Sequence, residues 1–547
     1  MGPSFDVIVV GSGASGVHAA YPLVQAGRQV AMIDVGHEDD RYRSLIPSAS
    51  FMDIRRNDPH QHRYFLGDDL EGIPLGGVGA GPQITPPRQF VLRDGEALAP
   101  KLAPDFFPLE SFAMGGLAGA WGAVSFPFLD SELHRCGLPA AEVQKHYQIV
   151  AQRIGVSGKA HDDLESVRGR LAAMQPALEV DHNARKMLGR YQARREAFQR
   201  AGVYLGQTLL AALSQPIGAR QPNAYNDMDF WTNTGDSVYR PEVTLRELSQ
   251  RPNFHYLRPF LVESFSENVS GQVQVSGRRI HGTATEIWTG RALIMAAGSL
   301  GTTRIVLRSL KKYDQRVPFT CNPHTYIPCI HYRALGQLHQ ERCHSLAQLT
   351  MVYDPTRDHN NLVQAQSYSY RSLMLFRLLK QAPLPYREGL RIMRALAPSF
   401  VIWVVQHDDV PDSAKYCVLR RGSDPASDRL EIGYRLSTES VRRQDECEKT
   451  IMRHIRKIGC YPIKRVHPGH GSSVHYGGQF PMTRDDKPLT TDPAGRLRGT
   501  KAVYIVDGSS LAYLPAKGPT LTLMANANRV GGNVLTDGMD SMRSSAS

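Results

Sequence analysis

Three parts of the sequence predict an α/β protein that combines a Rossmann-like nucleotide-binding domain, assembled from discontinuous segments, with a mixed α+β substrate domain. The first is a strand, glycine turn, helix and second strand at residues 5–36. The second is a buried apolar run that ends in Ala-Ala-Gly at residue 298. The third is a strand at 502–506 that is followed by a helix. Continuous apolar runs are typical of parallel strands covered on both faces.

The N-terminal pattern has every element of a dinucleotide-binding unit. Asp6–Val10 is a nearly all-apolar run, and residues 11–16 read Gly-Ser-Gly-Ala-Ser-Gly. Residues 17–26 carry apolar side chains at helical spacing before a glycine suited to a helix C-cap. Gln29–Ile33 is the second strand. Because the elements occur in this order, the pattern favours a dinucleotide site over its alternative, an ordinary βαβ turn.

The residues of this unit have separate predicted roles. Gly11 makes the tight turn, Gly13 lets the backbone approach a pyrophosphate, and Gly16 lets the helix pack on the strand. Asp34 lies 18 residues after Gly16, where a carboxylate can bind ribose hydroxyls. These residues do not separate NAD from FAD, although an acid followed by Gly36 is more typical of flavoproteins.

Composition excludes several classes of protein. The chain is 41% hydrophobic and 21% charged, as in an ordinary globular protein, and its net charge of +12 is dispersed rather than gathered in a nucleic-acid-binding arm. The seven cysteines are odd in number and form no CxxC pair, which argues against a disulfide framework or a metal centre. The fold begins by residue 5 and no apolar run reaches spanning length, so we expect a cytoplasmic protein.

The following segments alternate between loop and helix. Residues 37–110 are irregular and contain a glycine-rich run at 76–81, which predicts a loop that wraps a ligand. Helices are expected at Ala140–Ile154, Asp163–Met174 and Ala184–Gly202.

Strand patterns return further along. Short helices are expected at Val243–Leu248 and Thr302–Leu310, and strands at Phe254–Phe265, Gln272–Val275 and Ala292–Gly298. A helix is expected at Pro519–Val530. We therefore assign residues 1–135, 241–312 and 461–538 to the nucleotide-binding domain, 136–240 and 313–460 to the substrate or cap domain, and 539–547 to a disordered tail.

Residues 371–406 mix basic and apolar side chains with three prolines. Two short amphipathic helices in this segment could lie on a membrane interface. A solvated helix pair that covers the substrate domain is the favoured alternative.

Taken together, four blocks resemble the glucose–methanol–choline (GMC) oxidoreductase family, and most closely its pyranose-oxidase and sugar-dehydrogenase branch. They are the opening unit at 5–36, Gly-Gly-Leu-Ala-Gly-Ala-Trp-Gly at 115–122, Ala-Ala-Gly at 296–298, and the stretch from 475 to 520. Residues 136–240 and 310–460 resemble nothing specific.

The resemblance implies FAD as cofactor. Ala120 stands where some family members carry a histidine bonded covalently to the flavin, so non-covalent binding is expected. Val262 would contact adenine through its backbone, and the helix after Pro519 would face the flavin pyrimidine. The implied cofactor-binding residues are Gly11, Ser12, Gly13, Ala14, Ser15, Gly16, Asp34, Gly115, Gly116, Trp121, Gly122, Val262, Ala297, Gly298, Asp507, Gly508, Pro519 and Thr520.

His475 is the candidate catalytic base, because hydride removal from an alcohol requires a group that accepts the hydroxyl proton. It occupies an H-x-x-G-x-x-x-M block similar to the family's, and a structural histidine in a glycine-rich loop is the alternative. His467 and His470 lie nearby, but no acid or cysteine joins them at ligand spacing, so no metal is expected.

Gly518 departs from the family pattern, which places a second His or Asn before the Pro-Thr pair. Lys517, Tyr513 or Tyr476 could replace it, or His475 could act alone. The leading hypothesis is an FAD-dependent oxidoreductase that acts on a C–OH group of a sugar-like alcohol. A redox-neutral isomerase or lyase that retains FAD is the alternative that Gly518 favours, and a catalytically silent scaffold is a third. Electron acceptor, substrate and oligomeric state do not follow from the sequence.

Overall fold

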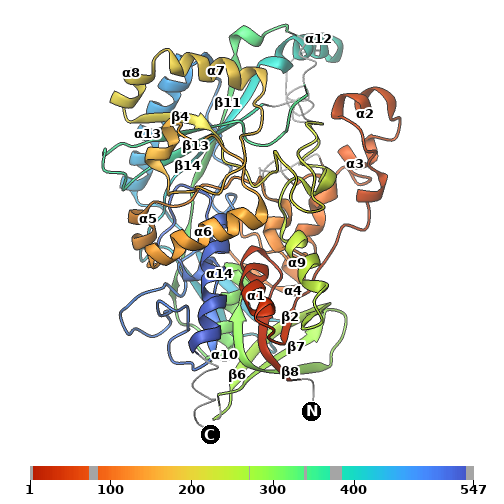
Figure 1. The fold of residues 1–547 in the computed structure, drawn as a ribbon, viewed down its shortest axis with the longest axis vertical. Coiled ribbons are helices and arrows are strands. Elements are labelled where there is room, and N and C mark those ends of the chain that lie inside the picture. The colour runs from red at the N-terminus through yellow and green to blue at the C-terminus, as the bar shows by residue number, and fades with distance from the viewer. Residues whose placement is uncertain (1–3, 73–83, 270, 338–341, 370–384, 538–547) are drawn as a thin grey trace.

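A mostly parallel sheet and an antiparallel sheet lie at opposite ends of the computed structural model (Figure 1). The structure describes residues 4–72, 84–269, 271–337, 342–369 and 385–537. Outside these ranges lie the glycine-rich run at 76–81, residues 371–384 of the basic and apolar segment, and the 539–547 tail.

The first sheet joins segments from both ends of the chain. β1 pairs in parallel with β2 and β8, β2 with β5, and β8 with β19, while β7 and β6 add two antiparallel strands. The N-terminal, central and C-terminal strand predictions are thus confirmed as parts of one sheet. Its strands are β1 (Ser4–Val10), β2 (Val30–Ile33), β5 (Phe254–Leu257), β6 (Phe260–Glu267), β7 (Val273–Arg279), β8 (Thr285–Met295) and β19 (Val503–Ile505).

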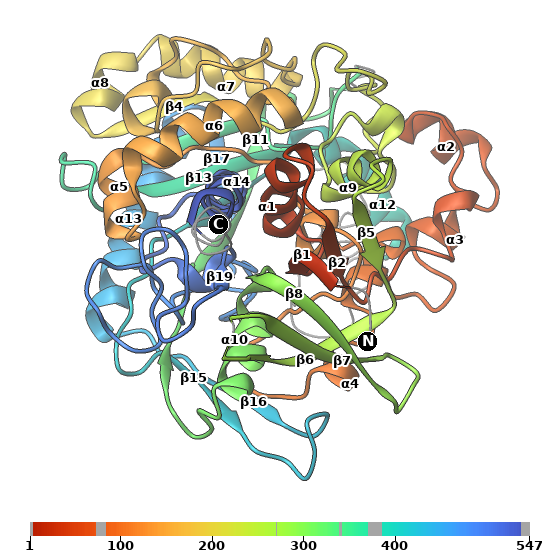
Figure 2. The ribbon, with the colours of Figure 1, turned by 60° about the horizontal axis from the view of Figure 1, so that its bottom comes forward.

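The first and last helices of the chain pack side by side on this sheet. α1 (Ala14–Gln25) follows the glycine turn, and α14 (Thr520–Asp537) lies against it (Figure 2). A Cβ on Gly531 would lie 2.2 Å from the carbonyl oxygen of Ala19, so the two backbones approach as closely as glycine allows. The other long helix of this end is α10 (Gly298–Ser309), which starts directly after β8.

The second sheet is antiparallel and has the order β17-β11-β14-β13-β12-β4. Its side chains alternate, and one face is closed by buried residues of α7 (His182–Gln192), α8 (Arg195–Arg200) and α13 (Thr438–Lys457). Because β4 comes from the 136–240 segment, the two inserted stretches build one sheet. The strands are β4 (Val203–Gln207), β11 (His324–His331), β12 (Leu349–Tyr353), β13 (Val363–Ser369), β14 (Phe400–Gln406) and β17 (Cys460–Pro462).

Two small sheets connect these layers. β15 and β16 bury Cys417, Leu419, Leu430 and Ile432 in the core of the first sheet. The two-stranded sheet joins β10 to β18 and brings 320–321 beside 476–477. The strands are β3 (Lys101–Leu102), β9 (Val317–Pro318), β15 (Tyr416–Arg420), β16 (Arg429–Gly433), β10 (Thr320–Cys321) and β18 (Tyr476–Gly477).

The remaining helices correct two expectations. The single helix expected at Ala184–Gly202 is divided into α7 and α8, and the helix expected at Asp163–Met174 does not form. Only a short 3₁₀ turn, Asp163–Val167, forms where a helix to Met174 was expected, and a Cβ on Gly169 would lie 2.2 Å from the carbonyl oxygen of Phe128. The helices are α2 (Phe51–Asn57), α3 (His62–Phe65), α4 (Gly95–Leu98), α5 (Asp130–Arg135), α6 (Ala140–Ile154), α7 (His182–Gln192), α8 (Arg195–Arg200), α9 (Pro241–Ser249), α12 (Tyr386–Leu396) and α13 (Thr438–Lys457).

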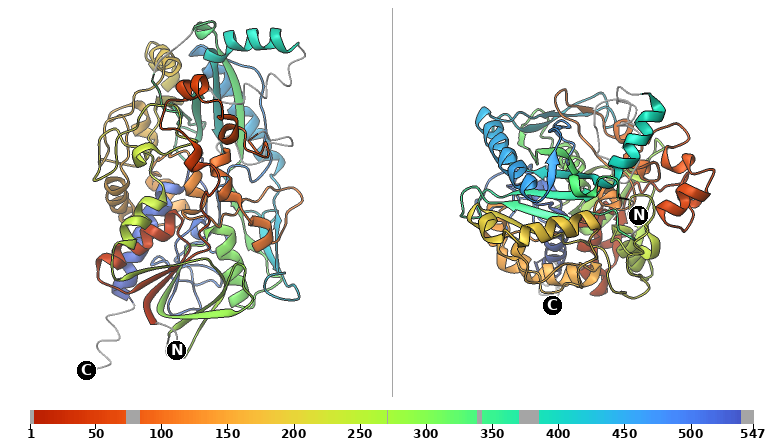
Figure 3. Two further views of the ribbon diagram at one scale, coloured as in Figure 1. Left: turned by 90° about the vertical axis from the view of Figure 1, so that its right-hand side faces the viewer. Right: turned by 90° about the horizontal axis from the view of Figure 1, so that it is seen from above.

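The 371–406 segment is likewise only partly helical where it is described. α12 lies at the end of the molecule farthest from the two termini (Figure 3), but residues 400–406 form β14 because their β-branched and aromatic side chains suit a buried strand. None of the helices in the described ranges has the length and apolar character needed to cross a membrane.

Candidate active site

Two cavities adjoin between the sheets. The first, here called the glycine-turn cleft, opens at the carboxyl ends of β1 and β8 and is lined by the turn after β1 and the start of α10. The second, here called the sheet pocket, has a volume of about 310 Å³ and a wall formed by β11, β13 and β14. The residues that line both are Leu109, Leu117, Ala118, Val474, His475 and Thr520.

The glycine turn has the geometry that its sequence predicts. Gly11 has φ +99°, and a Cβ there would lie 2.5 Å from the carbonyl oxygen of Ala296 on the neighbouring segment. A Cβ on Gly16 would lie 1.9 Å from the carbonyl oxygen of Gly11, which no side chain could tolerate. α1 starts after Gly13 with neither a side-chain cap nor an acidic residue in its first turn. The positive end of α1 therefore faces the cleft without a protein anion.

Asp34 lies at the end of β2, inside the cleft. Its Oδ2 accepts hydrogen bonds from the Ser12 hydroxyl and, at 3.0 Å, from the Tyr256 hydroxyl. Burial raises the pKa of Asp34 to about 6 although both of these donors oppose the shift. The Ser12 oxygen in turn accepts the Gly115 N–H at 3.0 Å, so the glycine turn and the second glycine-rich loop are joined through this pair.

The second glycine-rich loop divides between the two cavities. Gly115 and Gly116 have φ of +82° and +57°, and Gly116 packs against Gly13 and lines the cleft. Trp121 and Gly122 instead line the sheet pocket, with the Trp121 indole donating to the Tyr239 carbonyl at 2.7 Å. Ala120 also lines the sheet pocket.

The C-terminal block closes the cleft. Asp507 is buried, and its carboxylate accepts from the Ser509 N–H and hydroxyl and from the Thr302 hydroxyl, while burial raises its pKa. Asp507 is thus held by protein donors. A Cβ on Gly508 would lie 2.3 Å from the Tyr476 carbonyl oxygen.

The structure brings most of the predicted residues to one place. Gly16 and Gly115 line neither cavity and act through backbone packing. Those that line the cleft are Gly11, Ser12, Gly13, Ala14, Ser15, Asp34, Gly116, Val262, Ala297, Gly298, His475, Asp507, Gly508, Pro519 and Thr520.

His475 lies on the wall common to both cavities. Its Nδ1 is buried without a hydrogen-bond partner among the described residues. Burial lowers its pKa to about 4, so the ring is neutral near pH 7. A neutral imidazole without a protein partner is free to accept a proton from a ligand.

The neighbouring histidines are separate from this site. His467 Nδ1 lies 3.0 Å from the Thr325 hydroxyl, and the His470 ring packs on Tyr434. In the described ranges, no group of three or more His, Cys, Asp or Glu residues could hold a metal ion.

Gly518 lies beside His475, but the proposed substitutes for its missing side chain have other partners. Lys517 is buried and donates to Glu132 at 2.6 Å. The Tyr513 hydroxyl donates to Asp408 at 3.2 Å, and that of Tyr476 to the Gly471 carbonyl at 2.6 Å. Neither Lys517 nor Tyr513 lines either cavity, and Tyr476 lines only the cleft.

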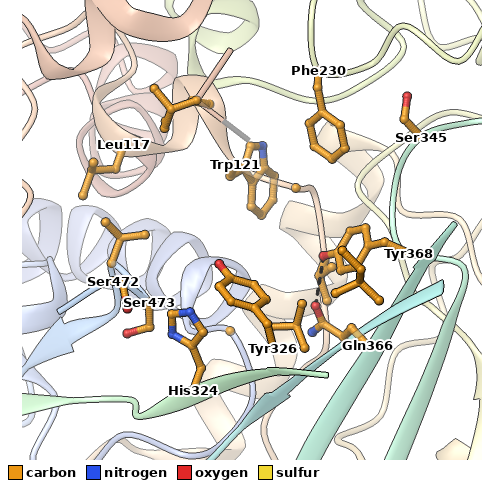
Figure 4. Close-up of a pocket in the computed structure, with 18 of the residues that line it drawn as sticks. Leu117, Trp121, Phe230, His324, Tyr326, Ser345, Gln366, Tyr368, Ser472 and Ser473 are labelled. Atoms are coloured by element: carbon orange, nitrogen blue, oxygen red, sulfur yellow. Dashed lines mark hydrogen bonds between the residues drawn. The ribbon is translucent and has the colours of Figure 1, made fainter. Parts of the chain in front are cut away.

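The sheet pocket holds polar residues that sequence reasoning missed. Figure 4 shows His324, Tyr326, Gln366 and Tyr368 on its strands, facing Trp121 across the cavity. The Tyr368 hydroxyl donates to Gln366 Oε1 at 3.2 Å. Their only sequence signal is period-two alternation along β11 and β13, which does not say which cavity they line.

A second missed group borders the cleft. Glu110 is buried between Lys101 Nζ at 3.3 Å and Arg304 Nη2 at 3.5 Å. Glu110 and Arg304 both line the cleft. Nothing in the irregular 37–110 sequence distinguishes Glu110 from the other acids there.

Comparison with known proteins agrees with this geometry. Residues 428–527, which include His475 and Gly518, match the protein family described as GMC oxidoreductase. The chain is 23% identical to paromamine 6'-oxidase of Streptomyces fradiae and 24% identical to 6'''-hydroxyparomomycin C oxidase of Streptomyces lividus. Each alignment covers 96% of this chain and 90% of the relative.

The match confirms the resemblance to the GMC oxidoreductases that four blocks of the sequence indicate. Together with the two relatives it shows an oxidoreductase that acts on CH–OH donors, which confirms the leading hypothesis in its general form. Both relatives are named as oxidases, in agreement with the expected sugar-oxidising branch.

Proposed function

We propose that this protein is a GMC oxidoreductase that binds FAD non-covalently in the glycine-turn cleft and oxidises a C–OH group of a sugar-like or other alcohol in the sheet pocket, with His475 as the base. The observation that carries the proposal is the position of His475 on the wall common to both cavities. A substrate carbon beside it would also border the cleft.

The residues of the cleft fit FAD. The uncapped start of α1 suits the pyrophosphate. The side-chain donors to Asp34, Ser12 and Tyr256, both reach Oδ2, so Oδ1 suits a ribose hydroxyl. Val262 would contact adenine, and the start of α14 at Thr520 would face the flavin pyrimidine. Bound FAD would supply the hydride acceptor at its N5 atom. Ala120 has no atom for a covalent bond to the flavin.

His475 holds the proton in this scheme. Its neutral ring accepts the proton of the substrate hydroxyl as the C–H bond breaks, and no metal is required. The walls around it exclude water, since most of the side chains that line the sheet pocket are aliphatic or aromatic. The polar side chains of Gln366, Tyr368 and Ser345 also line the sheet pocket and could bind further hydroxyl groups of the substrate.

The relatives support a sugar-like substrate, because their names specify oxidation of paromamine and of 6'''-hydroxyparomomycin C. The pocket volume, about 310 Å³, is at the lower end of the range of small-molecule sites.

Anaerobic reduction of the bound flavin tests the function. The purified protein should be yellow and should release free flavin on acid precipitation. Glucose, sorbitol, paromamine and benzyl alcohol form the panel, and at least one should bleach the flavin. Protein that takes up no FAD on reconstitution would overturn the proposal. Turnover of a panel member without flavin bleaching would favour the redox-neutral alternative instead.

A further inference from the structure

We infer that His324 supplies the second polar contact to the substrate hydroxyl group, the contact for which Gly518 has no side chain. The inference rests on the proposed function, since it concerns the same hydroxyl group that His475 deprotonates. His324 begins a strand of the antiparallel sheet, whereas the residues considered for this role from the sequence were Lys517, Tyr513 and Tyr476.

The backbone holds His324 beside His475. β10 and β18 pair Cys321 with Tyr476, and the Asn322 N–H continues the ladder by donating to the His475 carbonyl at 3.4 Å. The buried Asn322 side chain donates to the carbonyls of His407 at 2.8 Å and Pro515 at 2.9 Å. These contacts fix the start of β11, where His324 is the first residue.

The His324 side chain faces the sheet pocket (Figure 4). Only 9% of the residue is exposed, yet no protein group in the described ranges hydrogen-bonds to either ring nitrogen. Its ring packs edge-on against Tyr326 with centroids 5.0 Å apart, which fixes its orientation. Because the ring lies on the wall of the pocket, its nitrogens are left to bond a ligand there.

The charges around His324 keep it neutral. Burial, together with the nearby His475, His407 and His467, lowers its pKa to about 3. Glu448, the carboxylate beside His407, is occupied by His407 at 3.2 Å, by the Thr325 hydroxyl at 2.6 Å and by Arg465 at 3.1 Å. A neutral imidazole still carries one N–H, which it can donate to the substrate oxygen.

The two histidines then have different tasks. His324 donates a hydrogen bond to the substrate oxygen and keeps its own proton throughout. His475 takes the hydroxyl proton as the C–O bond becomes a carbonyl, and bound FAD would supply the acceptor for the hydride that leaves the carbon. One proton and one hydride thus account for the oxidation.

The position of Gly518 provides a rescue variant. A Cβ there would lie 3.7 Å from His475 Cε1 and 3.9 Å from its Nε2, which is ordinary contact distance, and its φ lies outside the left-handed region. Gly518→Asn therefore places an amide beside His475 with little strain, and it can replace the donor lost in His324→Ala.

The test compares His324→Ala, Gly518→Asn and the double variant with the wild-type protein. The readouts are the rate constant of anaerobic flavin reduction by the fastest member of the panel above, the flavin content and the melting temperature. We expect His324→Ala to lower the rate constant about 10²-fold, as loss of a preorganised donor does, with flavin content and melting temperature near wild type. The double variant should recover at least tenfold.

His331→Ala is the matched control. His331 lies on the same strand, is fully buried and also lacks ring partners among the described residues, but it does not line the pocket. This variant should keep the wild-type rate constant whatever its melting temperature.

The outcomes separate the two proposals. If no alcohol of the panel reduces wild-type flavin, the proposed function is wrong and the role of His324 with it. If wild-type flavin is reduced and His324→Ala reacts within threefold of it, only the role of His324 is wrong. If His324→Ala does not fold, His324→Gln and His324→Leu replace it in the test. A rate constant that is kept in the Gln variant but lost in the Leu variant supports the inference. Equal rate constants in these two variants overturn it.

Discussion

Gly518 lies against His475, close enough that an added Cβ would be 3.7 Å from Cε1 of the imidazole. Position 518 is therefore the place beside His475 where a second side chain was expected to contact the substrate hydroxyl, and the glycine leaves that place without one. Both Gly518 and His475 line the sheet pocket, whose other histidine is His324 at the start of β11.

Removal of His475 should slow the chemistry without loss of the cofactor. We expect His475→Ala to lower the rate constant of flavin reduction by about 10²–10⁴-fold, the usual contribution of a general base. Flavin content should stay at the wild-type level. His470→Ala, which removes an imidazole that lines neither cavity, is the control in stopped-flow reduction. Equal rates for the two variants would assign His475 a structural role.

The pH profile should be displaced to the acid side. Burial lowers the pKa of His475 to about 4, so the ring stays neutral and able to accept a proton down to that value. The rate constant of flavin reduction should be flat between about pH 5 and pH 8 and should fall only below about pH 4. A midpoint near 6.5, the value of an exposed imidazole, would contradict this account.

FAD affinity should depend on Asp34 and on pH. Burial raises the pKa of Asp34 to about 6, so the carboxylate is protonated below that pH and ionised above it. Because the ionised form accepts ribose hydrogen bonds, FAD affinity should rise between pH 5 and pH 7. Quenching of flavin fluorescence on binding measures this affinity. In Asp34→Asn the affinity should be lower and the slope absent. Glu38→Gln, an exposed neighbour, should keep both.

Uncharged alcohols should be better substrates than their amino analogues. Among the described residues that line the sheet pocket, Asp227 is the one carboxylate, and it already interacts with another protein group. An ammonium group buried without a counter-charge costs several kcal/mol. We therefore expect at least tenfold higher kcat/KM for glucose than for glucosamine at pH 6, with the ratio falling as the amine deprotonates. A constant ratio would indicate an acidic partner elsewhere.

Two adjacent glycines of α14 should respond in opposite ways to alanine. In Gly531→Ala the new methyl group would meet the Ala19 carbonyl at 2.2 Å, so we expect a loss of about 1–3 kcal/mol in unfolding free energy. At Gly532 nothing lies within 4 Å, and alanine should stabilise the helix by up to ~1 kcal/mol. Thermal unfolding measures both.

The first sheet could be predicted because its signals are local. The apolar runs of β1, β8 and β19 and the spacing of Gly11, Gly13 and Gly16 carry their structural meaning within a few residues. The same local reasoning failed at 163–174, where Gly169 packs on the Phe128 carbonyl, a contact that sequence neighbours do not reveal.

The sheet pocket could not be predicted, because its residues meet only through long-range pairing. His324 and His475 are adjacent since β10 pairs with β18, and no spacing rule connects strands 150 positions apart. The side chains considered as replacements for the one missing at Gly518 all lie in the 475–520 block of the sequence. The structure instead directs Lys517 and Tyr513 into buried pairs with Glu132 and Asp408.

The close approach of Gly531 to Ala19 also bears on synthesis. The glycine turn is among the first segments to leave the ribosome, but the helix that braces it is among the last. At about 5–20 residues per second, that delay is of the order of 25–100 s. During this time the nascent β1 and α1 lack β19 and α14, and for about the first half of it they also lack β8. We therefore expect flavin loading to follow chain release, and carboxy-terminal truncations that remove α14 to yield colourless, aggregating protein.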